Sequence, residues 1–253
     1  MKITAIIPAR YSSNRLPGKP LLEIAGKSMI RHVVERVDLA EDIDEVLVAT
    51  DDERIADEVR SFGGRAVLTS PEHPSGTDRI AEVAAGMDFE VAVNVQGDEP
   101  LVRPSMIADL VAPFHTLPDL EMATLATRLR EPADFRDPSK VKVVRDLDGY
   151  ALYFSRAPVP FDRDAVLSGR EEPSTLVLKH IGMYAFTRDY LLEFAETEPT
   201  PLEKIERLEQ LRALETGHRI WVALTPHDTV GVDTMDDLER VRRIVEGREP
   251  ERT

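Results

Sequence analysis

The chain has 253 residues, 42% of them hydrophobic and 31% charged, which is typical of a globular protein with one large domain or two small ones. It contains no cysteine, which excludes disulfides and thiolate metal sites, and it has neither an apolar run long enough to span a membrane nor a signal peptide, so we expect a cytoplasmic protein without a membrane partner. The formal net charge of -15 leaves no broad basic face, and we expect no nucleic-acid partner.

Strand and helix patterns alternate in the first part of the chain. Apolar runs predict strands at residues 3–7, 45–50, 66–68 and 91–95, and helical periodicity predicts helices at 29–37, 52–62, 77–85 and 105–114. Ser28 stands before the first of these helices as an N-cap. Such alternation is typical of βαβ units, and it predicts a parallel sheet with right-handed crossovers.

The pattern changes after about residue 122, where strand-like segments follow one another closely. We predict strands at 122–127, 140–145, 150–155, 180–186 and 220–224, a turn at 146–149, a loop at 157–175, and helices at 188–196, 201–216 and 234–245. We therefore expect an α/β fold with a mostly parallel, Rossmann-like sheet and a smaller inserted mixed or antiparallel subdomain. The main domain would comprise residues 1–120 and 216–246, the subdomain 121–215, and a tail 247–253.

Basic residues gather directly after the first predicted strand. Residues 1–32 hold six basic side chains and one acidic side chain, although the whole chain is acidic. Arg10, Arg15 and Lys19 follow the strand on a loop that two prolines restrict. Because open α/β sheets bind ligands at the carboxyl ends of their strands, this loop is suited to a nucleotide phosphate chain. Its spacing does not match a Walker A loop, and a solvated connector is the alternative.

Two aspartates that are far apart in sequence indicate a possible metal site. Asp98 follows the strand predicted at 91–95, and Asp233 precedes the last predicted helix. Two carboxylates from separate strand ends suit Mg²⁺, which prefers oxygen ligands and keeps phosphate oxygens in its shell. Either residue alone is also explained as a turn residue or a helix cap.

The segment His-Pro-Ser-Gly-Thr-Asp-Arg at residues 73–79 has two interpretations. Its Ser-Gly pair lets the backbone approach a flat ligand such as a base. The segment is also explained as a helix entry capped by Thr77, and both interpretations can hold at once. His73 alone does not indicate a metal site.

Eight segments match a known family in the family's own order, at residues 7–21, 49–51, 73–79, 94–100, 150–156, 179–184, 206–212 and 231–234. By this set the sequence closely resembles the 3-deoxy-manno-octulosonate (Kdo) cytidylyltransferases. The resemblance implies a nucleotide-diphospho-sugar-transferase-like fold and a homodimer. It also implies that CTP and Kdo react to give CMP-Kdo and pyrophosphate, with Mg²⁺ as the cofactor, for lipopolysaccharide biosynthesis.

The resemblance also implies residue roles. Lys19, Arg10, Asp98 and Asp233 would be catalytic, and Asp98 and Asp233 would bind Mg²⁺. Nucleotide contacts would come from Ala9, Arg10, Arg15, Lys19, Ser75, Gly76, Arg79 and Gln96. Sugar contacts would come from Arg156, His180, Tyr184, Glu209 and Gln210. The 2-hydroxyl of Kdo would attack the α-phosphorus, and His180 is expected as a sugar contact rather than as a base.

Two alternatives stay open from the sequence. A cytidylyltransferase for a sialic-type acid or an amino variant of Kdo would share the CTP half and differ around 156–184 and 206–212. A non-catalytic nucleotide-binding regulator is the other alternative. The intact Lys19, Asp98 and Asp233 argue against a regulator, because simple binding needs no metal pair.

Overall fold

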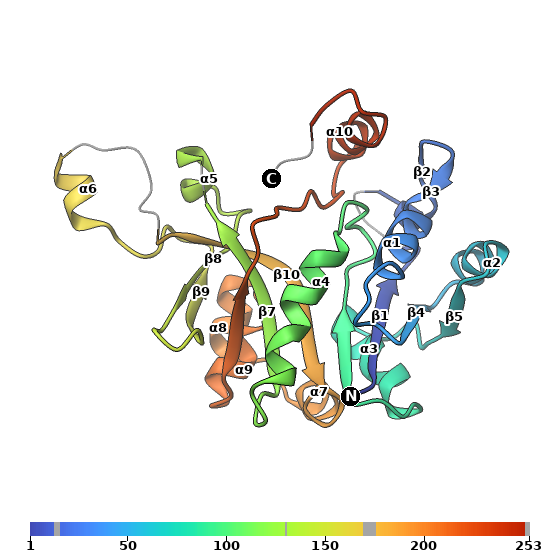
Figure 1. Cartoon of the computed structure of the whole chain (residues 1–253), viewed down its shortest axis with the longest axis horizontal. Coiled ribbons are helices and arrows are strands. Elements are labelled where there is room, and N and C mark those ends of the chain that lie inside the picture. The colour runs from blue at the N-terminus through green and yellow to red at the C-terminus, as the bar shows by residue number, and fades with distance from the viewer. Residues whose placement is uncertain (13–15, 130, 169–175, 251–253) are drawn as a thin grey trace.

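A computed structural model describes residues 1–12, 16–129, 131–168 and 176–250 (Figure 1). Its centre is a nine-stranded sheet with the order β11-β7-β10-β6-β1-β4-β5, to which β8 and β9 are added through β10. The strands are β1 (Ile3–Ala9), β4 (Glu45–Thr50), β5 (Arg65–Leu68), β6 (Val91–Asn94), β7 (Met122–Arg128), β8 (Lys142–Arg145), β9 (Ala151–Ser155), β10 (Leu178–Thr187) and β11 (Ile220–Leu224).

Strand direction decides which residues meet at the functional edge of the sheet. β1 is parallel to β4 and to β6, β4 is parallel to β5, and β11 is parallel to β7. Only β10 among these runs the other way, antiparallel to β6 and to β7. The beginning of β10 therefore lies at the edge where its neighbours end. The sheet is mixed and mostly parallel, as predicted.

Helices cover both faces of the sheet (Figure 1). Alternate residues of β1 point to opposite faces, so Ile3 and Ile7 belong to one apolar cluster and Ile6 to the other. The first cluster includes residues of α1 (Met29–Val37), α2 (Glu53–Ser61) and α4 (Pro104–Val111), and the second includes residues of α3 (Gly76–Ala85), α7 (Arg188–Glu196) and α9 (Leu211–Glu215). A third, smaller cluster packs α10 (Met235–Val245) against the N-terminal region.

The predicted strands and the helices before residue 122 are confirmed within a few residues, and Ser28 caps α1 as predicted. Two later predictions are wrong. The predicted loop at 157–175 contains a helix, α6 (Arg163–Ser168). The helix predicted at 201–216 is interrupted between α8 (Pro201–Glu206) and α9, because Arg207 is left-handed with a φ of 54°.

Four short elements were not predicted from the sequence: the hairpin strands β2 (Glu23–Ile24) and β3 (Lys27–Ser28), the helix α5 (Pro132–Arg136) and the 3₁₀ turn η1 (Lys19–Leu21). The end of the helix predicted at 105–114 is a second 3₁₀ turn, η2 (Ala112–His115). Residues 121–215 do not build a separate sheet, since β7 and β10 lie inside the central one. Within the described residues, no helix has the length and apolar character needed to cross a membrane.

Candidate active site

The carboxyl ends of β1 and β6 form one wall of a cleft of about 260 Å³. The N-terminus of α3, the turn η1 and the loop before α10 complete it. Its lining consists of Pro8, Ala9, Arg10, Lys19, Pro20, His73, Ser75, Gly76, Arg79, Gln96, Gly97, Asp98 and Asp233. The structure thus brings together every predicted nucleotide and metal residue that it describes. Arg15 lies outside the described residues.

Lys19 lies between the two predicted metal aspartates. Its ammonium donates hydrogen bonds of 2.5 Å to Asp98 Oδ2, 2.8 Å to the Val232 carbonyl and 3.4 Å to Asp233 Oδ1. Gly18 before it is left-handed with a φ of 68°, and an added Cβ would approach the Tyr11 ring to 3.0 Å. Glycine is therefore required at this turn, which aims Lys19 into the cleft.

The N-terminus of α3 forms another part of the cleft wall. Ser75 caps the helix in a capping box with Asp78, so the alternative in which Thr77 is the cap is wrong. The Thr77 side chain instead donates a 2.5 Å hydrogen bond to Glu209 Oε2. At Gly76, an added Cβ would come within 3.2 Å of the Pro8 side chain, so the helix start packs closely against the end of β1.

Arg79 holds this wall in place from inside the protein. It is 3% exposed, and its guanidinium donates to Thr69 Oγ1 at 2.5 Å and to Asp51 Oδ2 at 3.1 Å. Gln96 Nε2 donates to Asn94 Oδ1 at 3.0 Å, and the ring of His73 contacts the Glu82 carboxylate. A buried, paired guanidinium is rigid, so Arg79 offers a fixed positive surface rather than a mobile cation.

A second cavity of about 390 Å³ adjoins the cleft and shares Asp233 with it. Its lining comes from the beginning of β10, the 139–140 segment and the loop into α10: Glu99, Ser139, Lys140, Lys179, His180, Ile181, Gly182, Thr229, Gly231, Asp233, Thr234 and Asp237. His180 is the one residue of the predicted sugar set in this lining. Because Asp233 lines both cavities, the two cavities meet at this residue.

The ring of His180 is buried in the wall of this second cavity. Its Nε2 lies 2.8 Å from Thr124 Oγ1, and burial, with the charge of Lys179, lowers its pKa to about 3. The imidazole is therefore neutral near pH 7, and it is a poor general base because its proton affinity is too low. Its ring centroid lies 5.5 Å from that of Tyr184, whose hydroxyl donates to Gln210 Oε1 at 3.1 Å.

Arg156 does not line the second cavity, and its side chain contacts backbone groups. Its guanidinium donates to the backbone carbonyls of Pro138, Glu206 and Arg207 at 2.9, 2.7 and 3.2 Å. It thereby joins the end of β9 to the 138–140 segment and to α8. Lys142 supports the same segment, since its fully buried ammonium donates to the carbonyls of Asp137, Lys140 and Arg156.

Sequence reasoning missed four charged residues of the second cavity: Glu99, Lys140, Lys179 and Asp237. Burial, followed by the neighbouring Asp98 charge, raises the pKa of Glu99 to about 8. Lys179 pairs with Asp228 at 2.5 Å. The acidic doublet at 98–99 was a usable signal for Glu99. Lys179 opens the matching segment 179–184, but it stands at the start of a strand, whereas ligand sites are expected at the carboxyl ends of strands.

The donor set in the cleft fits a hard cation. Asp98 and Asp233 converge on one positive charge, the Lys19 ammonium, and both offer only oxygen. Over the described ranges, no group of three or more His, Cys, Asp or Glu side chains is arranged to hold a metal. Two carboxylates would therefore need substrate or water oxygens to complete the coordination of Mg²⁺.

Comparison with known proteins agrees with this geometry. Residues 4–220 match the family model described as Cytidylyltransferase. The chain is 55% identical over 245 residues to the 3-deoxy-manno-octulosonate cytidylyltransferase of Geobacter sulfurreducens, covering 95% of this chain and 98% of the relative. It is 49% identical over 243 residues to the protein of the same name from Solibacter usitatus, covering 96% of this chain and 94% of the relative.

Solved structures give the same answer. A CMP:2-keto-3-deoxy-manno-octonic acid synthetase complexed with CTP superposes with a TM-score of 0.91 at 41% identity, covering 98% of this chain and 100% of that one. A 4-diphosphocytidyl-2C-methyl-D-erythritol synthase from Anaerococcus prevotii shares the fold alone, with a TM-score of 0.63 at 15% identity over 97% of this chain and 98% of that one. The chain therefore belongs to the cytidylyltransferase family and, within it, to the 3-deoxy-manno-octulosonate cytidylyltransferases.

Proposed function

We propose that this enzyme transfers the CMP group of CTP to the 2-hydroxyl of Kdo and releases pyrophosphate, which supplies CMP-Kdo for lipopolysaccharide biosynthesis. The observation that carries the proposal is the junction of the two cavities at Asp233, directly beside Lys19 and Asp98. One cavity has the cations and helix terminus that suit a nucleotide, and the other has the lysines and buried polar groups that suit a sugar acid.

In this proposal the basic residues of the cleft stabilise the charge that develops in the reaction. Negative charge grows on the pyrophosphate oxygens as the bond to the α-phosphorus breaks, so Lys19 and Arg10 act more strongly on the transition state than on bound CTP. Arg15 is proposed to assist them. Ser75, Gly76, Arg79, Ala9 and Gln96 are proposed to hold the cytidine end, since they line the other part of the cleft.

Asp98 and Asp233 are proposed to hold Mg²⁺. The ion, when bound, neutralises phosphate charge and favours ionisation of the attacking hydroxyl. The Lys19 ammonium contacts both aspartates, so it is positioned to bind a phosphate oxygen when CTP enters the cleft.

The second cavity is proposed as the site of the sugar acid. Lys140 and Lys179 offer positive charge for its carboxylate, and the neutral His180 offers a hydrogen bond to a hydroxyl. Tyr184, Glu209 and Gln210 are proposed to support this wall from its buried side. We propose for Arg156 a supporting role, because its donors are used by backbone carbonyls.

The organisation of the chain supports two further proposals. Residues 121–215 supply six of the twelve residues that line the second cavity, and we propose that this segment also mediates a homodimer. Large apolar side chains are exposed on it, with Phe161 at 74%, Leu167 at 73% and Leu152 at 63%. We propose a cytoplasmic location, because CTP is a cytoplasmic metabolite. Light scattering on the purified protein tests the dimer.

The reaction is tested by incubating the protein with CTP, Mg²⁺ and one acceptor at a time, and measuring pyrophosphate. The acceptors are Kdo, a sialic acid and an amino variant of Kdo. Release with Kdo, at a higher kcat/KM than with the others, is the expected result. A preference for another acid would replace Kdo as the acceptor, and CTP binding without turnover on any acid would support the regulator instead.

A further inference from the structure

A line of side-chain contacts, two of them hydrogen bonds, joins the nucleotide cleft to the second cavity through the interior. It starts at α3, where Ser75 and Gly76 line the cleft and Thr77 follows in the first turn. Thr77 is 3% exposed, and its hydroxyl donates a 2.5 Å hydrogen bond to Glu209 Oε2. These two residues are separated by 132 positions, so the bond ties the start of α3 to the loop between α8 and α9.

From Glu209 the line continues to the wall of the second cavity. The neighbouring Gln210 is 2% exposed and accepts a 3.1 Å hydrogen bond from the Tyr184 hydroxyl. Tyr184 packs against His180, with ring centroids 5.5 Å apart, and His180 lines the second cavity. Two hydrogen bonds, the chain link between Glu209 and Gln210, and one ring contact thus connect the two cavities.

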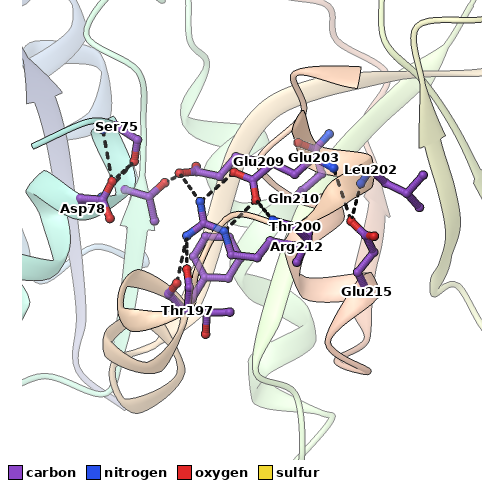
Figure 2. Close-up of polar contacts among 12 residues, drawn as sticks. Ser75, Asp78, Thr197, Thr200, Leu202, Glu203, Glu209, Gln210, Arg212 and Glu215 are labelled. Carbon is purple, nitrogen blue, oxygen red and sulfur yellow. Dashed lines mark hydrogen bonds and ion pairs between the residues drawn. The ribbon is translucent and has the colours of Figure 1, made fainter. Parts of the chain in front are cut away.

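The Glu209 end of this line is held by an ion cluster centred on the buried Arg212, which Figure 2 shows. Arg212 is 5% exposed and donates to both oxygens of Glu203, at 2.9 and 2.7 Å, and to the carbonyls of Phe194 and Thr197. Its guanidinium lies 3.9 Å from Glu209 Oε1. These four hydrogen bonds hold Arg212, so its guanidinium is a fixed positive neighbour for Glu209 Oε1. The other carboxylate oxygen of Glu209 accepts the hydrogen bond from Thr77.

In the described part of the chain, two buried polar atoms of this line are unsatisfied, which favours a rearrangement when a substrate binds. Glu209 Oε1 and Gln210 Nε2 are buried atoms without a hydrogen-bond partner within the described residues. A buried polar atom without a partner costs about 1–3 kcal/mol, so a small movement that gives either atom a partner is favourable. The segment that carries both atoms is thus poised to shift when one cavity fills.

We infer that the Thr77–Glu209 hydrogen bond couples the two substrate sites, so that a nucleotide bound at the start of α3 orders the 208–212 loop and strengthens binding of the sugar acid. Thr77 is on this inference a positioning residue that touches neither substrate. The inference rests on the proposed function, since it takes the second cavity as the sugar-acid site. By linkage, the sugar acid must strengthen nucleotide binding by the same factor.

The coupling is measured as the ratio of the Kd of Kdo without nucleotide to its Kd with a saturating CTP analogue. The analogue carries a methylene between its α- and β-phosphorus, so no transfer occurs. We expect a ratio of about fivefold or more for the unaltered protein. Thr77→Val keeps the shape and removes the hydroxyl, and it should bring the ratio within about twofold of 1. Thr77→Ser keeps a hydroxyl and should retain the coupling.

Thr116→Val is the matched control, because its hydroxyl donates only locally, to the Pro113 carbonyl at 3.2 Å, and it should leave the ratio unchanged. A merely structural role for Thr77 would lower stability and both affinities while leaving the ratio intact. That outcome, or a ratio near 1 in the unaltered protein, would overturn the inference.

A second measurement does not depend on the sugar acid or on a variant that folds. Addition of the CTP analogue and Mg²⁺ alone should slow hydrogen exchange of the Leu211 and Arg212 amides, which bond to the carbonyls of Leu208 and Glu209. Unchanged exchange at these amides would overturn the inference. If Kdo does not bind at all, the proposed function fails, and this measurement still decides whether the nucleotide orders the 208–212 loop.

Discussion

Lys19 Nζ on the N-terminal loop lies 2.5 Å from Asp98 Oδ2, a residue 79 positions later in the chain. The lysine side chain is 15% exposed and the aspartate 32%, so the pair is partly shielded from water. This bond places the Lys19 ammonium beside Asp98 in the cleft before any substrate binds. A positive charge already lies where phosphate charge and a metal ion are expected to meet.

Lys19→Met should reduce kcat strongly while leaving the fold intact. Loss of one preorganised charge contact to a developing anion costs about 2.7–4 kcal/mol, which is roughly 10²–10³ in rate. Steady-state pyrophosphate release measures it. Lys27→Met, which breaks only the half-exposed ion pair with Glu35, is the control. A Lys19→Met enzyme with nearly normal kcat would remove the phosphate role of this residue.

Asp98→Asn and Asp233→Asn should each abolish most activity, and the double variant should be little worse than either single one. Residues that act as a unit are non-additive, whereas independent helix caps cost about 1 kcal/mol each and add. Activity measured against Mg²⁺ concentration separates these cases. Asp57→Asn, at an exposed carboxylate paired with Arg60, provides the comparison. Two independent, additive losses would show that the aspartates do not share an ion.

Metal-free stability gives the same pair a second test. Two bare carboxylates would repel, and removing one would then stabilise the protein. Because the Lys19 ammonium contacts both, Asp98→Asn should instead lower the melting temperature in the presence of a chelator. Combined with Lys19→Met, it should lower that temperature by less than the sum of the two single effects.

Glu99→Gln should stabilise the protein increasingly as the pH rises. The folded-state pKa of Glu99 is about 8 against an ordinary 4.5, so between these values the folded state binds more protons than the unfolded state, and stability falls with pH. The amide cannot ionise and lacks this loss. At about pH 9 we expect a gain of roughly 1–4 kcal/mol over the unaltered protein, and little difference near pH 4.

Denaturant unfolding of the metal-free protein at several pH values measures this gain. Glu198→Gln, at an exposed position, should follow the unaltered protein throughout. Parallel stability curves for Glu99→Gln and the unaltered protein would mean that Glu99 is ionised in the folded state at neutral pH.

Lys140→Met should raise the KM for the sugar acid more than the KM for CTP, because Lys140 lines the second cavity and not the cleft.

Arg156→Lys should mainly lower stability, since its guanidinium is occupied by three backbone carbonyls. Lys204→Met on exposed α8 is the control. A selective rise of the sugar KM in Arg156→Lys with normal stability would return the sugar contact to Arg156.

The sequence was sufficient where one local pattern decides the structure. The apolar run of β1 and the Ser28 cap of α1 are local features, and both were predicted. The break at Arg207 was not predicted, because the helix propensity of the sequence continues through this residue and tertiary contacts cause the break. Glu206 next to the break accepts hydrogen bonds from Ser155 Oγ and the Arg156 amide, which fix the end of α8.

The candidate site shows the same division. Lys19, Asp98 and Asp233 follow strands or precede a helix at the expected edge, so their proximity was predictable. Lys179 was not, since only the reversed direction of β10 brings a strand's beginning to that edge. The use of Thr77 as a hydrogen-bond donor to Glu209 depends on how α3 meets the α8–α9 loop, which no local pattern records.

The reversed direction of β10 has a consequence for how this enzyme can vary. β7 ends at Arg128 and β10 begins at Leu178 as its neighbour on the same edge, so the chain between them, which carries β8 and β9 beside β10, departs and returns at adjacent points. Closing a longer or shorter excursion there costs little, about 0.6 kcal/mol for each doubling of its length. The acceptor side can thus be lengthened, trimmed or exchanged while the register of the nucleotide-side strands stays the same.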